Sequence, residues 1–216
     1  MSRYQCRVDK TQQPSAEPVR ILCAADATYA APLCVMLVSL LTHHAKGRKI
    51  EIYVVATNLP EEDRRKIEAS LGRNRDDFDP GWLHWLSPSL ERIEGLPLSA
   101  YFTIDSYARF LAPWVLPEDF DKVLYLDCDM VILADLSPLY DSRCEGSAVH
   151  AARDPVGYVS GPYGVFNFSD LGIAPEAPYF NAGVLLMNLR RWREQAISER
   201  VLEYLRRHQA SVRFGD

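Results

Sequence analysis

The chain has 216 residues, a formal net charge of −5 at pH 7 and a hydrophobic fraction of 48%. This composition supplies apolar material for a core and no cationic excess, so it excludes a disordered chain, a collagen-like chain and a strongly basic nucleic-acid-binding protein. The length fits a single α/β domain of about 100–250 residues. The longest apolar stretch, residues 29–41, is shorter than the ~20 residues that a membrane-spanning helix needs, so we expect no membrane span.

The first eighteen residues are polar and lack the apolar run of a secretory signal. We expect residues 1–18 to form a flexible leader and residues 19–216 to form one domain. The five cysteines form no Cys-x-x-Cys pair, and their odd number leaves at least one unpaired. This usage favours a reducing compartment, so the cytoplasm is the expected location.

Strands and helices alternate in the first part of the chain. Residues 19–25 (VRILCAA) and 50–56 (IEIYVVA) have the composition of buried parallel strands, and an apolar helix ending at His44 is expected between them. Asn58 is the predicted N-cap of the next helix, which has a proline and acidic residues in its first turn and extends to about Leu71. This order is typical of a mainly parallel sheet with helices on both faces.

The rest of the chain continues this pattern less regularly. The predicted strands are residues 82–86, 122–126, 147–152 and 184–188, and the predicted helices are residues 106–116, stopped by Pro117, and 190–207. Residues 155–178 are rich in proline and glycine and form the longest predicted loop. A loop of that length in a compact domain is often functional.

The segment LYLDCD, residues 124–129, is an apolar strand that delivers two carboxylates, Asp127 and Asp129. In parallel sheets ligands bind beyond the carboxyl ends of the strands, where Asp26 and Asp127 both fall. Carboxylates at this spacing can share a divalent cation, which can in turn bind a diphosphate. From the tripeptide alone, a pair of solvated turn aspartates is an equal alternative.

Four motifs follow one another in a fixed order: AADATY from Ala24, SYAR from Ser106, DCD from Asp127 and FNAGVLLMN from Phe180. With these motifs the sequence resembles the retaining glycosyltransferases of family 8, which include bacterial lipopolysaccharide α-galactosyl- and α-glucosyltransferases and the glycogenins. The resemblance implies an α/β domain of the GT-A type, a UDP-hexose donor and a manganese ion, with magnesium as the alternative. It also implies a glycan or lipopolysaccharide-type acceptor and no nucleic-acid partner.

The resemblance assigns roles to individual residues. Uridine would be bound by Ala24, Ala25, Asp26 and Tyr29, with Asp26 accepting a hydrogen bond from the base and Tyr29 stacking on it. The other expected donor-binding residues are Arg109, Asp127, Cys128, Asn181, Ala182 and Gly183, of which the last three match a turn that lines the sugar site. Ordinary packing is the alternative for Tyr29, and a surface salt bridge is the alternative for Arg109.

The expected metal ligands are Asp127 and Asp129, and Cys128 is expected to fill space without acting as a nucleophile. The expected catalytic residues are Asp154, which matches an acidic residue that binds sugar hydroxyls, and Asp216. Family members continue past the position of Asp216 with Gln-x-x-x-Asn and later supply a metal-binding histidine in His-x-x-Gly-x-Lys-Pro-Trp. The resemblance therefore implies that a C-terminal part of the domain, with one metal ligand, lies outside this chain.

Two other functions stay open. A chain lacking that part could bind a nucleotide-sugar without transferring the sugar. The segment DCDMV from Asp127 also resembles the nucleophile motif of haloacid-dehalogenase-type phosphatases, but no lysine follows Lys122. The basic face of residues 190–207 indicates either a solvated helix surface or peripheral contact with the inner face of a membrane, and homo-oligomerisation is undecided.

Overall fold

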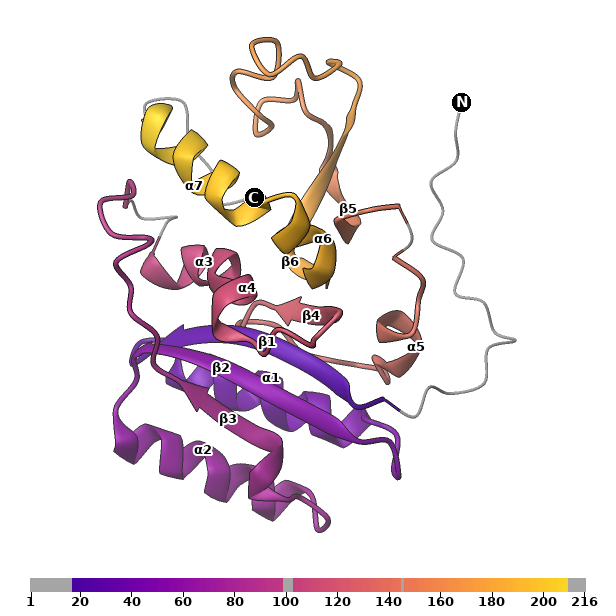
Figure 1. Cartoon of the computed structure of the whole chain (residues 1–216). Helices are drawn as coiled ribbons and strands as arrows, with labels where there is room; N and C mark the ends of the chain where they lie inside the picture. Colours follow the sequence, from indigo (N-terminus) through magenta and orange to yellow (C-terminus); the bar gives the residue numbers. More distant parts are fainter. Residues whose placement is uncertain (1–16, 99–102, 145, 210–216) are drawn as a thin grey trace.

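The computed structural model of the protein describes residues 17–98, 103–144 and 146–209. Within them, a six-stranded sheet in the order β3-β2-β1-β4-β6-β5 is flanked by helices (Figure 1), which confirms the predicted α/β class. The strands are β1 (Val19–Asp26), β2 (Ile50–Asn58), β3 (Leu83–Leu86), β4 (Lys122–Leu126), β5 (Val149–Tyr158) and β6 (Pro178–Asn188). The helices are α1 (Ala30–His43), α2 (Glu61–Asn74), η1 (Pro80–Trp82), α3 (Ile104–Ala108), η2 (Arg109–Leu111), α4 (Ala112–Val115), α5 (Ser137–Tyr140), α6 (Leu189–Glu194) and α7 (Ile197–Arg207).

The sheet has a parallel and an antiparallel part. Strands β1 to β4 pair in parallel, with Val19 opposite Ile50 and Ile21 opposite Leu124. Strand β6 pairs antiparallel with both β4 and β5. The parallel strands place their carboxyl ends at one edge, and the antiparallel β6 brings its first half to that same edge beside the end of β4.

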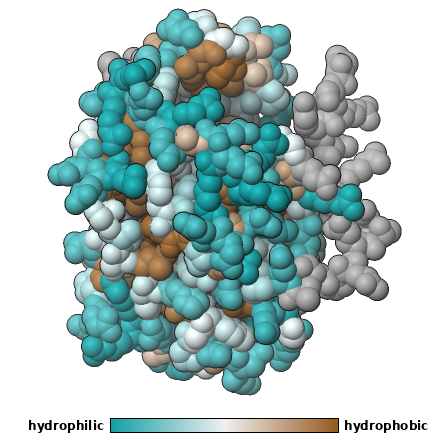
Figure 2. Space-filling model, in the orientation of Figure 1, coloured by the Kyte–Doolittle hydropathy of each residue, from teal (hydrophilic) through white to brown (hydrophobic). Residues whose placement is uncertain are grey.

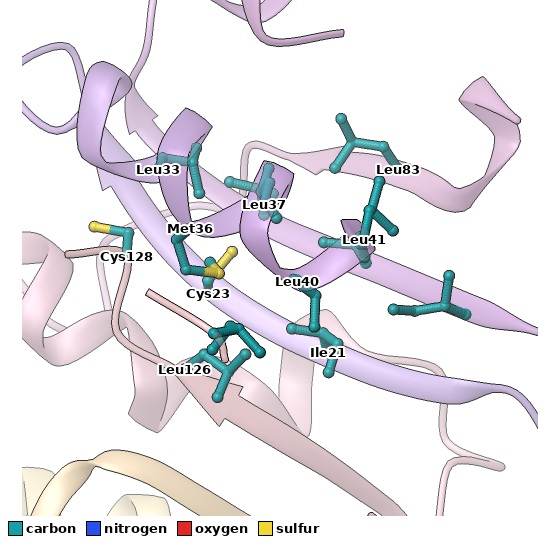
Figure 3. Packing of buried hydrophobic residues seen from close by; sticks show 14 of the residues in the cluster. Ile21, Cys23, Leu33, Met36, Leu37, Leu40, Leu41, Leu83, Leu126 and Cys128 are labelled. Atoms are coloured by element: carbon teal, nitrogen blue, oxygen red, sulfur yellow. The ribbon is translucent and has the colours of Figure 1, made fainter. Parts of the chain in front are cut away.

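Alternation along the strands divides the core between the two faces of the sheet. Ile21 and Cys23 of β1 pack with α1 and α2 on one face, whereas Leu22 and Ala24 pack with α3, α4 and α6 on the other. Figure 3 shows the first cluster, in which Met36 and Leu37 of α1 lie over β1 and β2. Helices on both faces leave the carboxyl edge of the sheet as the place where polar side chains gather.

The antiparallel strands are longer than the sequence pattern predicts. Strand β5 continues to Tyr158, so the first residues of the predicted 155–178 loop are in a strand. Strand β6 starts at Pro178, and Asn181, Ala182 and Gly183 therefore lie within a strand and not in the predicted turn. The pairing of β6 with β5 explains the difference, because hydrogen bonds to a neighbouring strand override the weak local propensity of this segment.

Two predicted helices are broken and one cap is misplaced. Residues 106–116 divide into α3, η2 and α4, because Pro113 has no N–H to continue the helical bonding. Residues 190–207 divide into α6 and α7 at Ala196, whose backbone is left-handed (φ 47°). Asn58 ends β2 and does not cap α2; the cap position is Pro60, which has no side-chain cap bond.

Hydrophilic side chains cover most of the face seen in Figure 2, and hydrophobic residues gather in separate patches. One patch lies at the top of the view, over the β5–β6 connection, which exposes Tyr163, Phe166 and Leu171. In the part of the chain that the structure describes, no helix is both long and apolar enough to cross a membrane.

Candidate active site

The carboxyl edge of the sheet brings together residues that are far apart in the sequence. Asp26 is the last residue of β1, and Asp127 follows the last residue of β4. The backbone N–H of Asp127 donates to the carbonyl of Gly183 (2.9 Å), so the end of β4 is joined to β6. Three of the four sequence motifs thus meet at one edge, and Arg109 brings in the fourth.

Arg109 is buried, with 6% of its surface exposed. Its guanidinium donates to the carbonyls of Ser106 (3.0 Å) and Ala182 (2.7 Å) and to Oδ1 of Asp127 (3.3 Å). The hydroxyl of Tyr125 donates to the same Oδ1 at 2.7 Å. The ion pair between Arg109 and Asp127 is therefore an interior one and not the surface salt bridge considered from the sequence.

A second set of hydrogen bonds joins the antiparallel strands. The side-chain nitrogen of Asn181 donates to Oδ2 of Asp154 (3.5 Å), and its oxygen accepts from the N–H of Gly183 (2.9 Å). Asp154 also accepts from the N–H of Val156 (2.8 Å). The Asp154 carboxylate is thereby connected, through Asn181 and Gly183, to the backbone N–H of Asp127.

Gly183 has little room for a side chain. A Cβ at this position would lie 3.0 Å from Oδ2 of Asp127 and 3.0 Å from Oδ1 of Asn181. Contacts that short require both side chains to shift. The absence of a side chain therefore allows the side chains of Asp127 and Asn181 both to approach the backbone of Gly183.

Asp26 shapes the start of α1. Its Oδ1 accepts from the N–H groups of Thr28 (2.8 Å) and Tyr29 (3.1 Å). Among the described residues, no donor hydrogen-bonds to its Oδ2. Tyr29 is half-buried against the α1 side of the core, and Ala24 and Ala25 are buried in β1. The side of the site at β1 therefore has small side chains, one carboxylate oxygen and one aromatic ring.

Carboxylates dominate the charge of this edge. Asp129 is exposed and has no hydrogen-bond partner among the described residues. Burial, assisted by the charges of Asp129, Asp127 and Asp105, raises the pKa of the Cys128 thiol to about 12, so the thiol is neutral at pH 7. Burial also raises the pKa of Asp105, which accepts a hydrogen bond from Thr57 at 2.6 Å. In residues 17–98, 103–144 and 146–209, no three His, Cys, Asp or Glu side chains form a ready metal site.

Sequence reasoning missed two contributors to the site. Tyr125 precedes Asp127 by two residues, and period-2 alternation places both on one face, which is a signal that the sequence contains. The pair of Thr57 and Asp105 has no such signal, because it joins β2 to α3 across 48 residues. Asp216 and the first sixteen residues of the predicted leader lie outside the described residues.

Comparison with known proteins gives consistent matches. The model of glycosyl transferase family 8 matches residues 20–216. General stress protein A of Bacillus subtilis (strain 168) is 25% identical over 193 residues, which cover 89% of this chain and 63% of that protein. Glycosyltransferase GlyF of Streptococcus pneumoniae serotype 4 (strain TIGR4) is 26% identical and covers 91% of this chain and 43% of that protein.

The fold is similar to that of solved glycosyltransferases. The crystal structure of galactosyltransferase LgtC in complex with donor and acceptor sugar analogues superposes with a TM-score of 0.76 at 30% identity, covering 91% of this chain and 67% of that chain. The chain spans less than two thirds of the curated relatives named above. The phosphohydrolase alternative has no support among these matches.

Proposed function

Because the chain belongs to glycosyl transferase family 8, we propose that it transfers a hexose, galactose or glucose, from a UDP-sugar to an acceptor hydroxyl with retention at the anomeric carbon. The observation that carries the proposal is the junction of Asp127, Asn181 and Asp154 at the carboxyl edge of the sheet. This edge is where α/β sheets bind nucleotides. The acceptor in this proposal is a lipopolysaccharide or another glycan, and the similarity to LgtC, whose structure contains an acceptor sugar analogue, supports a sugar acceptor.

The nucleoside binds at the β1 side of the site. Oδ1 of Asp26 is occupied by two backbone donors, which leaves Oδ2 to accept from a ring N–H of the base. Tyr29 occupies the N-cap position of α1 and offers an aromatic face for stacking. Ala24 and Ala25 carry no bulky side chain that would keep the base from the end of β1.

The diphosphate binds near Asp127 and Asp129. An exposed carboxylate and a half-buried one, two residues apart, suit a small divalent cation, which proteins commonly hold with one or two carboxylates and the phosphates of the substrate. The donor set therefore fits manganese, with magnesium as the alternative. Such a cation offsets the charge that grows on the departing UDP.

The sugar binds beside the hydrogen-bonded pair of Asp154 and Asn181. Asp154 accepts hydrogen bonds from sugar hydroxyls, and Asn181 holds Asp154 in place (3.5 Å). Within the described part of the chain we assign no carboxylate as a covalent nucleophile, so we favour same-face attack by the acceptor over double displacement. Asp216 is the further catalytic residue in this proposal.

The location proposed for this reaction is the cytoplasm. The chain has five cysteines, an odd number with no Cys-x-x-Cys pair, so at least one has no intrachain disulfide partner, and this usage favours a reducing compartment. Where the acceptor is lipid-linked, the enzyme works at the inner face of the membrane.

The proposal is tested by incubating the protein with UDP-galactose or UDP-glucose, manganese and a panel of glycan acceptors, and by determining the anomeric configuration of the product by NMR. Transfer with retention is expected, and Asp154→Asn is expected to lower kcat/KM at least about tenfold by weakening bonds to the sugar. Asp170→Asn, an exposed aspartate of the β5–β6 connection, is the matched control. Manganese-dependent UDP binding without transfer would instead support the non-catalytic nucleotide-sugar-binding alternative.

A further inference from the structure

Two side chains, Tyr125 and Arg109, donate hydrogen bonds to the same oxygen of the Asp127 carboxylate. The Tyr125 hydroxyl lies 2.7 Å and the Arg109 Nη2 lies 3.3 Å from Oδ1. The Arg109 guanidinium also lies over the Tyr125 ring, 4.8 Å from its centroid. The three side chains therefore form one cluster: β4 supplies the Tyr125 ring, the residue after β4 supplies the Asp127 carboxylate, and η2 supplies the Arg109 cation.

Strand β6 restricts the orientation of the same carboxylate at its other oxygen, Oδ2. Oδ2 of Asp127 faces the α-carbon of Gly183, where a Cβ would lie only 3.0 Å away. The main chain of Asp127 is bonded to Gly183 (2.9 Å), and Arg109 is bonded to Ala182 (2.7 Å). The orientation of this carboxylate is thus determined by hydrogen bonds at one oxygen and by backbone at the other.

The Tyr125 hydroxyl is not required for packing. Its ring is buried in an apolar cluster with Val123, Leu185 and Met187, which a phenylalanine would fill equally well. Burying a hydroxyl group lowers the stability of the fold unless the hydroxyl forms a hydrogen bond. The Tyr125 hydroxyl forms such a bond with Asp127.

We infer that Tyr125 is a positioning residue, which together with Arg109 orients the Asp127 carboxylate toward the cation and diphosphate of the donor. The inference rests on the proposed function and adds to it a residue that does not itself touch the donor. Hydrogen-bond partners behind a metal ligand typically change metal affinity by about 10–100-fold when they are removed. A carboxylate that is already oriented loses less conformational entropy when the ligand binds.

The test is the affinity of the protein for UDP, measured by calorimetry with and without manganese, for wild type, Tyr125→Phe and Tyr140→Phe. Tyr140 is a matched control, because it is also buried, and its hydroxyl donates to the Lys122 carbonyl (3.5 Å) at the opposite end of β4. We expect Tyr125→Phe to weaken the manganese-dependent binding about tenfold, with metal-free UDP binding and the melting temperature unchanged. Tyr140→Phe is expected to stay within twofold of wild type.

Arg109→Lys is the second variant, since an ammonium cannot bridge Ala182 and Asp127 in the geometry of a guanidinium. It is expected to weaken the same manganese-dependent part of binding. Wild-type affinity in Tyr125→Phe, or an equal loss in Tyr125→Phe and Tyr140→Phe, overturns the inference. Absence of manganese-dependent UDP binding in wild type overturns the proposed function and the inference with it, so the wild-type arm separates the two failures.

Discussion

Gly183 shows how a single missing side chain shapes the site. A methyl group there would press on both Asp127 and Asn181 at 3.0 Å. We expect Gly183→Ala to weaken manganese-dependent UDP binding at least about fivefold, because both side chains must move from the positions that the donor needs. Calorimetry measures this effect, and Gly72→Ala is the control, since its Cβ would meet only Phe78 at 3.9 Å. Equal affinities for the two variants would contradict this role for Gly183.

His44 makes the stability of the protein depend on pH. Its side chain is buried, and burial lowers its pKa below the ordinary value of 6.5, although a hydrogen bond to the Arg48 carbonyl and the charge of Asp135, 3.7 Å away, oppose the shift. The charges of Arg75 and Arg48 lower the pKa further. The folded state therefore binds fewer protons than the unfolded state, and its stability is full above pH 6.5 and falls as the pH drops below that value.

We expect His44→Gln to flatten this loss of stability below about pH 6.5. His43→Gln is the control, because His43 is exposed and is the last residue of α1, directly before His44. Urea denaturation at several pH values gives the free energies of unfolding. The account is wrong if the pH dependence of His44→Gln matches that of wild type.

At the scale of elements, Arg193 of α6 holds the segment that connects α4 to β4. Its guanidinium donates to the carbonyls of Pro113, Leu116, Pro117, Glu118 and Phe120. Charge-assisted bonds of this kind are stronger than neutral ones. This side chain therefore links α6 to the segment that precedes β4, beside the backbone bond from Arg190 to Asp121 (3.4 Å).

We expect Arg193→Ala to lower the free energy of unfolding by about 2 kcal/mol, since the carbonyls lose their charged donor. Arg190→Ala is the matched control, because the Arg190 side chain is exposed and forms a long ion pair, with 3.9 Å between its Nε and Oδ1 of Asp121. Exposed ion pairs contribute about 0–1 kcal/mol. Denaturant titration compares the two variants, and an equally small loss in both would show that the segment does not depend on Arg193.

The strands of the parallel half are predictable from local sequence. Strands β1, β2 and β4 are continuous apolar runs that are buried on both faces, and their predicted starts at Val19, Ile50 and Lys122 agree with the structure. The extension of β5 and β6 is not predictable in this way. Its hydrogen bonds join segments such as Arg153 and Phe180, and local propensity contains no information about that pairing.

The same distinction applies to the candidate site. The place of Asp26 and Asp127 at strand ends follows from apolar runs that end in an aspartate. The hydrogen bond from Arg109 to the Ala182 carbonyl cannot be predicted from local sequence, because the two residues are 73 positions apart. The resemblance of the motifs to a known family predicts that these residues belong to one donor-binding site, and the structure adds the contacts between them.

At the scale of the whole molecule, the site lies where the two halves of the sheet meet. The parallel half contributes Asp26 and Asp127, and the antiparallel strands contribute Asp154 and Asn181. Hydrogen bonds through Gly183 couple the two halves directly. A donor that spans this junction would place its nucleoside on one half and its sugar on the other, as the proposed function requires.

The central claim is that Asp127 and Asp129 bind the donor diphosphate together with a divalent cation. The most direct measurement is calorimetry of UDP binding with and without manganese, for the wild-type chain and for Asp129→Asn. The account predicts binding that manganese strengthens at least about tenfold in wild type, and loss of that enhancement in Asp129→Asn. UDP binding that is equally strong with and without manganese, or that is unchanged in Asp129→Asn, would contradict it.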